Sequence, residues 1–103
     1  MPNSLLKSCV LFALLLMVSA CAVAPVQEMS NARQAVAAAE RAGAAEHAPL
    51  KLSLAKRLLQ AAQQALDRRD YAAARDNAMS ARREAVSALR ITQGLETPES
   101  NPP

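Results

Sequence analysis

Side chains that are mostly alanine repeat along the C-terminal half of the chain at the spacing of a helical seam. Between residues 71 and 93 they recur at alternating steps of three and four, at Tyr71, Ala74, Ala78, Ala81, Ala85 and Ala88. This heptad spacing places all six on one face of an α-helix. Alanine at most of these positions lets a second helix axis approach toward the short end of the ~8 to 10 Å range. The pattern therefore predicts a helix packed tightly against other helices.

Two more helical stripes precede this seam. Residues 26–42 and the glycine that follows them carry one apolar face, formed by Met29, Ala32, Val36, Ala39 and Gly43. Residues 49–68 carry two adjoining stripes, formed by Leu52, Ala55, Leu59, Ala62 and Leu66 and by Leu54, Leu58, Ala61 and Ala65. Because the second face is broad, we expect the helix over 49–68 to be the centre of the core. The chain is thus predicted to be all-α, a short antiparallel three-helix bundle made of a helical hairpin and one further helix.

Residues that start or stop helices stand between these stripes. Gly43 is placed to end the first helix, residues 44–48 to turn the chain, and Pro49 to open the second helix at its first position. Asp70 follows a polar break and can cap the third helix, which Gly94 ends. We therefore assign residues 29–94 to one helical domain and residues 95–103, which are rich in proline and polar side chains, to a disordered tail.

The first twenty residues have a different character. A single basic residue, Lys7, is followed by an unbroken apolar run over residues 9–17 and then by small residues. This order is typical of a secretory signal peptide. The run is shorter than the ~20 apolar residues that a spanning helix needs, and no basic flank follows it. We predict that residues 1–20 are a cleaved signal peptide outside the fold.

The signal-like segment ends in Val18-Ser19-Ala20-Cys21, which resembles the bacterial lipobox. The resemblance implies cleavage between Ala20 and Cys21, and attachment of fatty-acyl chains such as palmitate to Cys21. The alternative is an ordinary signal peptide cut nearby, with Cys21 left as a free thiol. The second cysteine, Cys9, lies in the segment to be removed, so the mature chain is predicted to hold no disulfide.

A lipid on Cys21 anchors the chain without a transmembrane segment. Each buried methylene contributes ~0.8 kcal/mol, and two or more acyl chains hold stably. Ala22 stands where inner-membrane lipoproteins commonly carry aspartate, so we expect sorting to the outer membrane, on the leaflet that faces the periplasm. Residues 21–28 form the lipidated N-terminus and a tether, which at ~3.5 Å per residue spans at most ~25 Å. The helices are therefore expected to stay close to the membrane.

Two motifs resemble the bacterial domain of unknown function 4398. The first is Ala-Gly-Ala-Ala-Glu-His-Ala-Pro over residues 42–49, and the second, after a leucine- and alanine-rich stretch, is Asp-Tyr-Ala-Ala-Ala-Arg over residues 70–75. His47 stands where the family usually has tyrosine, and Arg69 replaces the glycine before the second motif. The similarity covers residues 28–94. It implies a helical hairpin in short exported lipoproteins, some of which carry a peptidoglycan-binding domain, with no assigned activity.

The second motif is also similar to one helix of a tetratricopeptide unit. A solenoid needs about three such repeats, whereas this chain holds one copy. The similarity therefore supports a single tetratricopeptide-like helix pair plus one helix.

The sequence lacks the sets of side chains that catalysis requires. The sole histidine, His47, lies in a predicted turn beside Glu46, and no further His, Cys or carboxylate stands at metal-ligand or triad spacing. Two glycines cannot supply a phosphate-binding loop, and neither Gly-x-Ser-x-Gly nor His-Glu-x-x-His occurs. We predict no enzyme activity, no catalytic or metal-binding residue and no cofactor, with His47 as a turn residue.

Arginines recur along residues 71–93 with few acidic residues three or four positions away. They are Arg75, Arg82, Arg83 and Arg90. One interpretation is a solvated face that pairs across helices with Glu28, Glu40 or Asp67. The other is a surface for anionic lipid headgroups, lipopolysaccharide phosphates or an acidic protein. Nucleic acid is disfavoured as a partner, because the predicted export, one tyrosine and a net charge of only +3 all argue against it.

We therefore expect a non-enzymatic, lipid-anchored interaction or structural module of the bacterial envelope. Its alternatives are a binder of anionic envelope molecules through the arginines and a homo-oligomeric coiled coil. Self-association has a physical motive, because a buried alanine contributes ~0.8 kcal/mol against ~1.5 to 3 kcal/mol for a leucine. The expected partners are the membrane, through the lipid, and a second copy or another envelope protein.

Overall fold

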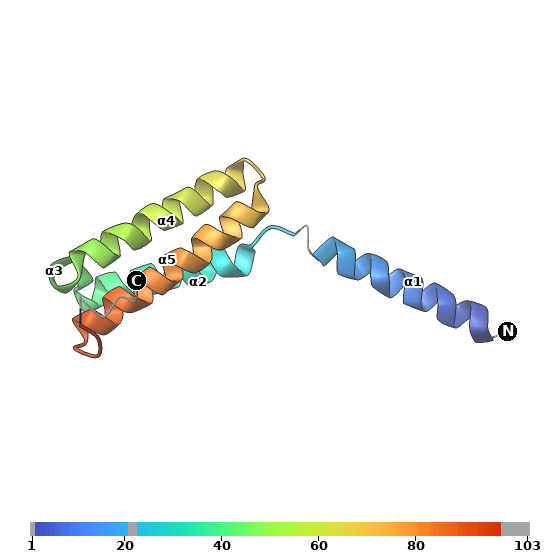
Figure 1. Ribbon diagram of the computed structural model, residues 1–103, viewed down its shortest axis with the longest axis horizontal. Helices are drawn as coiled ribbons and strands as arrows, with labels where there is room; N and C mark the ends of the chain where they lie inside the picture. Colours follow the sequence, from blue (N-terminus) through green and yellow to red (C-terminus); the bar gives the residue numbers. More distant parts are fainter. Residues whose placement is uncertain (1, 21–22, 98–103) are drawn as a thin grey trace.

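The computed structural model describes residues 2–20 and 23–97, with side chains described for residues 3–15 and 23–97. Over these residues the regular elements are all α-helices (Figure 1). They are α1 (Pro2–Ala20), α2 (Val26–Ala42), α3 (Ala44–His47), α4 (Pro49–Asp67) and α5 (Tyr71–Thr92). The predicted all-α class is confirmed, and the three long helices α2, α4 and α5 form the predicted bundle.

The centre of the bundle is α5. It packs against both α2 and α4, which contact each other less, and it also touches α3. Figure 1 shows α2 and α5 starting at the same end, so these two helices run parallel, and α4, which comes between them in the sequence, runs in the opposite direction. The expectation that residues 49–68 form the centre is wrong. On α4 only one leucine, Leu52, is buried, whereas the buried face of α5 consists of alanines alone, which lets two helices pack close to it.

The core follows the three predicted faces in part, because Gly43, Leu59, Leu66, Tyr71 and most of the second predicted stripe of α4 are only partly buried. From α5 the completely buried residues are Ala74, Ala78, Ala81, Ala85 and Ala88. The other helices contribute Met29, Ala32, Val36 and Ala39 from α2, Ala44 from α3, and Leu52, Ala55, Ala62 and Ala65 from α4. The two largest side chains that are fully buried are Met29 and Pro25. The core is therefore thin, and most of its contacts are made by methyl groups.

Most predicted helix boundaries are confirmed. Gly43 follows α2 with a φ of +96°, and Pro49 occupies the first turn of α4. The side chain of Asp70 caps α5, because its Oδ1 accepts a hydrogen bond from the backbone N–H of Ala73 at 3.3 Å. The segment predicted as a plain turn differs, since Ala44–His47 forms the one-turn helix α3.

Two helices end in the same hydrogen-bonded motif. After α4, the N–H of Asp70 donates to Ala65 O and that of Arg69 donates to Leu66 O. After α5, the N–H of Leu95 donates to Arg90 O and that of Gly94 donates to Ile91 O. Both are Schellman motifs, which require a left-handed residue at their centre. Gly94 supplies it with a φ of +75°, and Arg69 supplies it with a φ of +62°.

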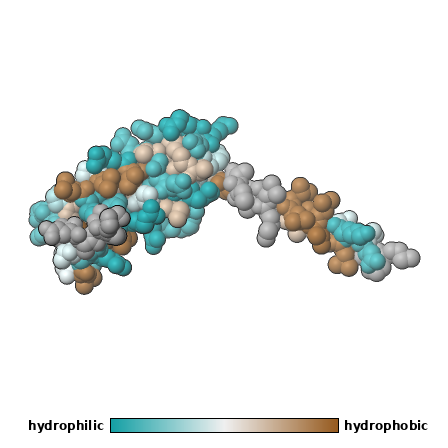
Figure 2. All heavy atoms as spheres, viewed as in Figure 1, coloured by the Kyte–Doolittle hydropathy of each residue, from teal (hydrophilic) through white to brown (hydrophobic). Residues whose placement is uncertain are grey.

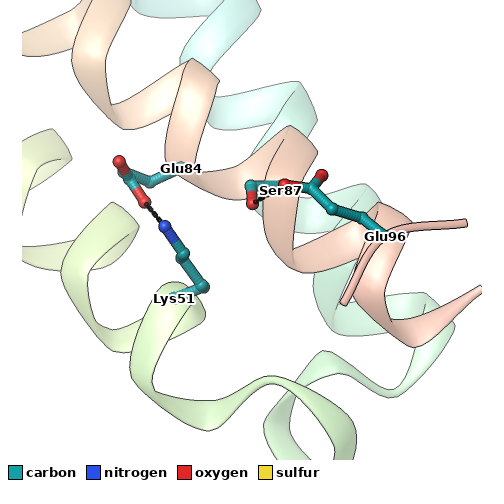
Figure 3. Close-up of polar contacts among 4 residues, drawn as sticks. All are labelled: Lys51, Glu84, Ser87 and Glu96. Carbon is teal, nitrogen blue, oxygen red and sulfur yellow. Dashed lines mark hydrogen bonds and ion pairs between the residues drawn. The ribbon is translucent and has the colours of Figure 1, made fainter. Parts of the chain in front are cut away.

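Regular structure and contacts continue beyond both ends of the domain assigned to residues 29–94. Residues 26–28, assigned to the tether, form the first turn of α2, and Pro25 is buried. Just before this turn, Val23 O accepts a hydrogen bond from Arg75. At the other end, Ser87 Oγ donates to Glu96 Oε1 at 3.3 Å, so the first residues of the predicted tail lie against α5 (Figure 3). Residues 98–103 of that tail lie outside the described part of the chain.

The first helix stands apart from this arrangement. All helix-to-helix contacts in the described part of the chain are made among α2, α3, α4 and α5. Within the same described residues, no helix combines the length and the hydrophobicity needed to cross a membrane.

Candidate binding surfaces

The predicted cleavage and lipidation site adjoins the start of the bundle. Cys21 lies outside the described residues, and Ala20 is the last residue of α1. The chain is described again from Val23, whose carbonyl oxygen accepts a hydrogen bond from Arg75 Nη2 at 3.3 Å. Only two peptide steps thus separate Cys21 from an atom that is bonded to α5.

Arg75 has a different role from the other predicted arginines. Its Nε lies 3.5 Å from Glu28 Oε1, and both side chains are about one-third exposed, at 34% each. With the bond to Val23 O, this pair joins α5 to the first turn of α2. Arg75 therefore holds the N-terminal segment in place, and an exposed pair of this kind contributes ~0.2 to 1 kcal/mol.

The other three predicted arginines are solvent-exposed: Arg82, Arg83 and Arg90. Arg83 Nη2 donates to Ser80 Oγ at 2.9 Å. In the described part of the chain, none of the three lies within 4.0 Å of a carboxylate oxygen. The acidic residues expected to pair with them are engaged elsewhere: Glu28 with Arg75, Glu40 with Lys56, and Asp67 as acceptor from Gln63. The structure thus separates Arg75, which is paired, from three arginines that keep their charge in solvent.

Two adjoining hollows lie beside these arginines and share Arg82 and Arg83. The first, of about 370 Å³, is completed by Glu28, Asn31 and Met79, and so spans α2 and α5. The second, of about 300 Å³, is completed by Val86, Ser87, Arg90 and Glu96. Met79 is 46% exposed. Guanidinium groups therefore alternate with apolar side chains along one side of α5, an arrangement suited to an anion attached to an apolar body.

The least exposed ion pair between two helices was not anticipated from the sequence. Lys51 Nζ of α4 lies 3.1 Å from Glu84 Oε2 of α5, and their side chains are only 15% and 23% exposed (Figure 3). The contact is an ion pair and not a well-directed hydrogen bond, because the buried Oε2 atom has no partner with hydrogen-bond geometry. In the sequence, Glu84 reads as one acidic residue beside Arg83. Its position next to the seam residue Ala85 is the signal that places it at the helix edge facing α4.

A second surface, mostly apolar, lies near the end of the bundle that holds α3. His47, Pro49, Leu50, Leu54 and Ile91 line a groove of about 450 Å³, which Ala48 and Lys51 complete. Leu50 is 84% exposed, and Figure 2 shows hydrophobic side chains gathered on this half of the body. Among the described residues no group of three or more His, Cys, Asp or Glu side chains is placed to hold a metal ion. The groove offers apolar contact, and His47 lies at its edge as an exposed side chain.

Comparison with known proteins gives one match. The model of the family "Domain of unknown function (DUF4398)" matches residues 27–94. The matched range begins in α2 and ends at Gly94, so it coincides with the bundle. Searches of curated proteins and of solved structures find no match.

Proposed function

The chain belongs to the DUF4398 family, and from that premise we propose that it is a non-enzymatic, lipid-anchored module of the bacterial envelope. The observation that carries the proposal is Val18-Ser19-Ala20-Cys21 at the end of an apolar segment. In this proposal residues 1–20 are removed, lipid is attached at Cys21, and the bundle faces the periplasm from the outer membrane. Its work is binding, to another envelope component or to a second copy.

The arrangement of the helices supports removal of the first segment. Because the helix contacts lie among α2 to α5, cleavage before Cys21 leaves the packing of the bundle in place. The new N-terminus then begins two residues before Val23, which is bonded to Arg75. A lipid at this point holds a folded domain directly against the membrane.

The exposed surfaces of the bundle are better suited to binding a partner than to catalysis. The arginines beside the two hollows present positive charge, and the groove at Leu50 presents apolar area. The alanine seam, which motivated the coiled-coil alternative, is fully buried within the single chain. A second copy would therefore have to use another surface, such as the exposed groove.

Metabolic labelling tests the anchor. A bacterial host that expresses the full chain is supplied with an alkyne-tagged palmitate, and the purified protein is examined for the tag and for its mass. We expect label on the wild-type chain and on Cys9→Ser, because Cys9 leaves with the signal segment, and none on Cys21→Ser. Label that persists in Cys21→Ser, or a labelled protein that retains residues 1–20, would contradict the proposal.

A further inference from the structure

We propose that the bundle lies flat on the bilayer that holds its lipid, with one side of α5 against anionic phospholipid headgroups. The contacting surface is the docking stripe, formed by Met79, Arg82, Arg83, Val86 and Arg90. The inference rests on the proposed lipid at Cys21 and goes beyond it by stating which side of the bundle meets the membrane, and which lipid chemistry it meets.

The segment that joins Cys21 to the bundle places the docking stripe next to the lipid anchor. Arg75, Met79, Arg82, Val86 and Arg90 follow one another at steps of four, three, four and four residues, so they share one side of α5. The first of them holds Val23 O at 3.3 Å. Two residues reach ~7 Å at ~3.5 Å each, so Cys21 cannot lie far from the beginning of this side. A lipid attached there brings the docking stripe, and not the opposite flank on α4, to the membrane surface.

The charges along the stripe fit a layer of phosphates. Three other basic side chains, Lys51, Lys56 and Arg75, each have a carboxylate partner. Arg82, Arg83 and Arg90 have none within 4.0 Å in the described residues. A guanidinium group binds phosphate oxygens in a bidentate manner, and each one near an anionic surface raises partitioning roughly fivefold. The stripe therefore has three donors that a phosphate layer would satisfy.

The carboxylates nearest to the stripe are already engaged. Glu28 pairs with Arg75, and Glu96 Oε1 accepts from Ser87. Between the arginines, Met79 is 46% exposed and Val86 lines the second hollow. Alternation of basic and apolar side chains along one face is the pattern of helices that lie in the plane of a membrane interface. Charge and hydropathy thus point to the same occupant, the headgroup layer of the bilayer.

Site-specific quenching on vesicles measures this orientation. The full chain is isolated in its lipidated form, in which an introduced cysteine is the one free thiol, and is reconstituted into phosphatidylcholine vesicles with or without phosphatidylglycerol. A fluorophore is attached at Met79→Cys on the stripe or at Ser53→Cys, which is exposed on α4. Nitroxides on the lipid headgroups quench labels that lie near the surface. We expect stronger quenching at position 79 than at position 53. This difference between the two positions should be larger in vesicles that contain phosphatidylglycerol, and it should shrink when added salt shortens the Debye length.

Matched arginine variants separate the stripe from general charge. With the label at position 79, the change Arg82→Ser, Arg83→Ser, Arg90→Ser is expected to abolish the response to phosphatidylglycerol. The control Arg41→Ser, Arg57→Ser, Arg68→Ser removes the same charge from exposed positions elsewhere and is expected to retain it. All six side chains are exposed, so both variants should keep the helical circular dichroism of the wild type.

The outcomes distinguish the orientation from the anchor. If the mass spectrum of the purified chain shows no acyl groups, the proposed lipid is overturned, and the flat docking is overturned with it. If the chain is lipidated but quenching is equal at positions 53 and 79, the docking alone is overturned. The same holds if the control variant loses as much of the phosphatidylglycerol response at position 79 as the stripe variant does. The docking is also overturned if quenching at position 79 does not change with phosphatidylglycerol or with salt, because the arginines would then have no part in the contact.

Discussion

Arg69 adopts a left-handed backbone conformation, with a φ of +62°, at the turn between α4 and α5. An L-residue with a side chain pays for this conformation because Cβ approaches the following carbonyl group, at a cost of ~1 to 2 kcal/mol. The sequence indicated this site only indirectly, as a position where the resembling family has glycine. Spacing and composition predict a polar break at this position. The positive φ of Arg69 follows from the Schellman motif, which only the structure shows.

Arg69→Gly is expected to stabilise the chain by about 1 kcal/mol, because glycine adopts a positive φ without the Cβ conflict and part of the gain is lost to its freer unfolded state. The midpoint of urea unfolding, followed by circular dichroism, measures the change. Gly94→Ala is the matched control of opposite sign, since Gly94 has a φ of +75° and no atom lies within 4 Å of an added Cβ. A lower or unchanged midpoint for Arg69→Gly would show that its side chain, and not its backbone, governs this turn.

At the scale of helices, the sequence predicted each long helix and its buried face but not how closely the faces approach. The predicted seam over Ala74, Ala78, Ala81, Ala85 and Ala88 is buried as expected. The width of an apolar face, from which the central helix was chosen, reports how much surface is available and not how near a neighbour can come. The sequence also did not reveal which charged side chains form ion pairs between helices. Arg75 and Glu84 have ion-pair partners, whereas Arg82, Arg83 and Arg90 lie within 4.0 Å of no carboxylate oxygen in the described residues, and the pairing depends on which side chains the packed helices bring together.

Glu84→Gln is expected to destabilise the bundle by about 1 to 2 kcal/mol, because the ammonium of Lys51 would stay in a site where its side chain is 15% exposed without a negative partner. Unfolding in urea measures the loss. Glu40→Gln is the control, since the pair of Glu40 with Lys56 is about half exposed and its loss should cost less than about 1 kcal/mol. Adding Lys51→Met to Glu84→Gln should recover most of the stability. If Glu84→Gln costs no more than Glu40→Gln, the pair does not join α4 to α5.

The whole molecule combines a thin core with a free first helix and an exposed apolar groove. The number, order and approximate bounds of the long helices in the bundle follow from helical periodicity and from Gly43, Pro49 and Asp70. The parallel course of α2 and α5 follows too, because the first and third helices of the predicted antiparallel bundle run in the same direction. The sequence did not predict α3, a single helical turn with no periodicity to detect. The groove escaped prediction for the same reason. It brings His47, the last residue of that turn, and Leu50, which follows the turn, beside Ile91 from the far end of α5.

This arrangement bears on self-association. The alanine seam was the sequence feature that favoured a homo-oligomeric coiled coil, but each of its alanines is fully buried by α2 and α4 of the same chain. The apolar surface most open to a second copy is the groove, where Leu50 is the most exposed large apolar side chain of the described residues. A few exposed apolar side chains of this kind are ordinary on a monomer. We therefore expect a chain that lacks residues 1–20 and carries Cys21→Ser to be a monomer in solution.

Sedimentation equilibrium at micromolar concentrations measures the mass of this chain. We expect the monomer mass, and no change on Leu50→Ser, because the groove would then be in solvent in both proteins. The matched variant Leu95→Ser removes another exposed leucine outside the groove and should behave in the same way. A dimer that dissociates on Leu50→Ser but not on Leu95→Ser would assign the groove to a second copy and make self-association the binding function of the module. A dimer that survives both changes would place the interface outside the groove.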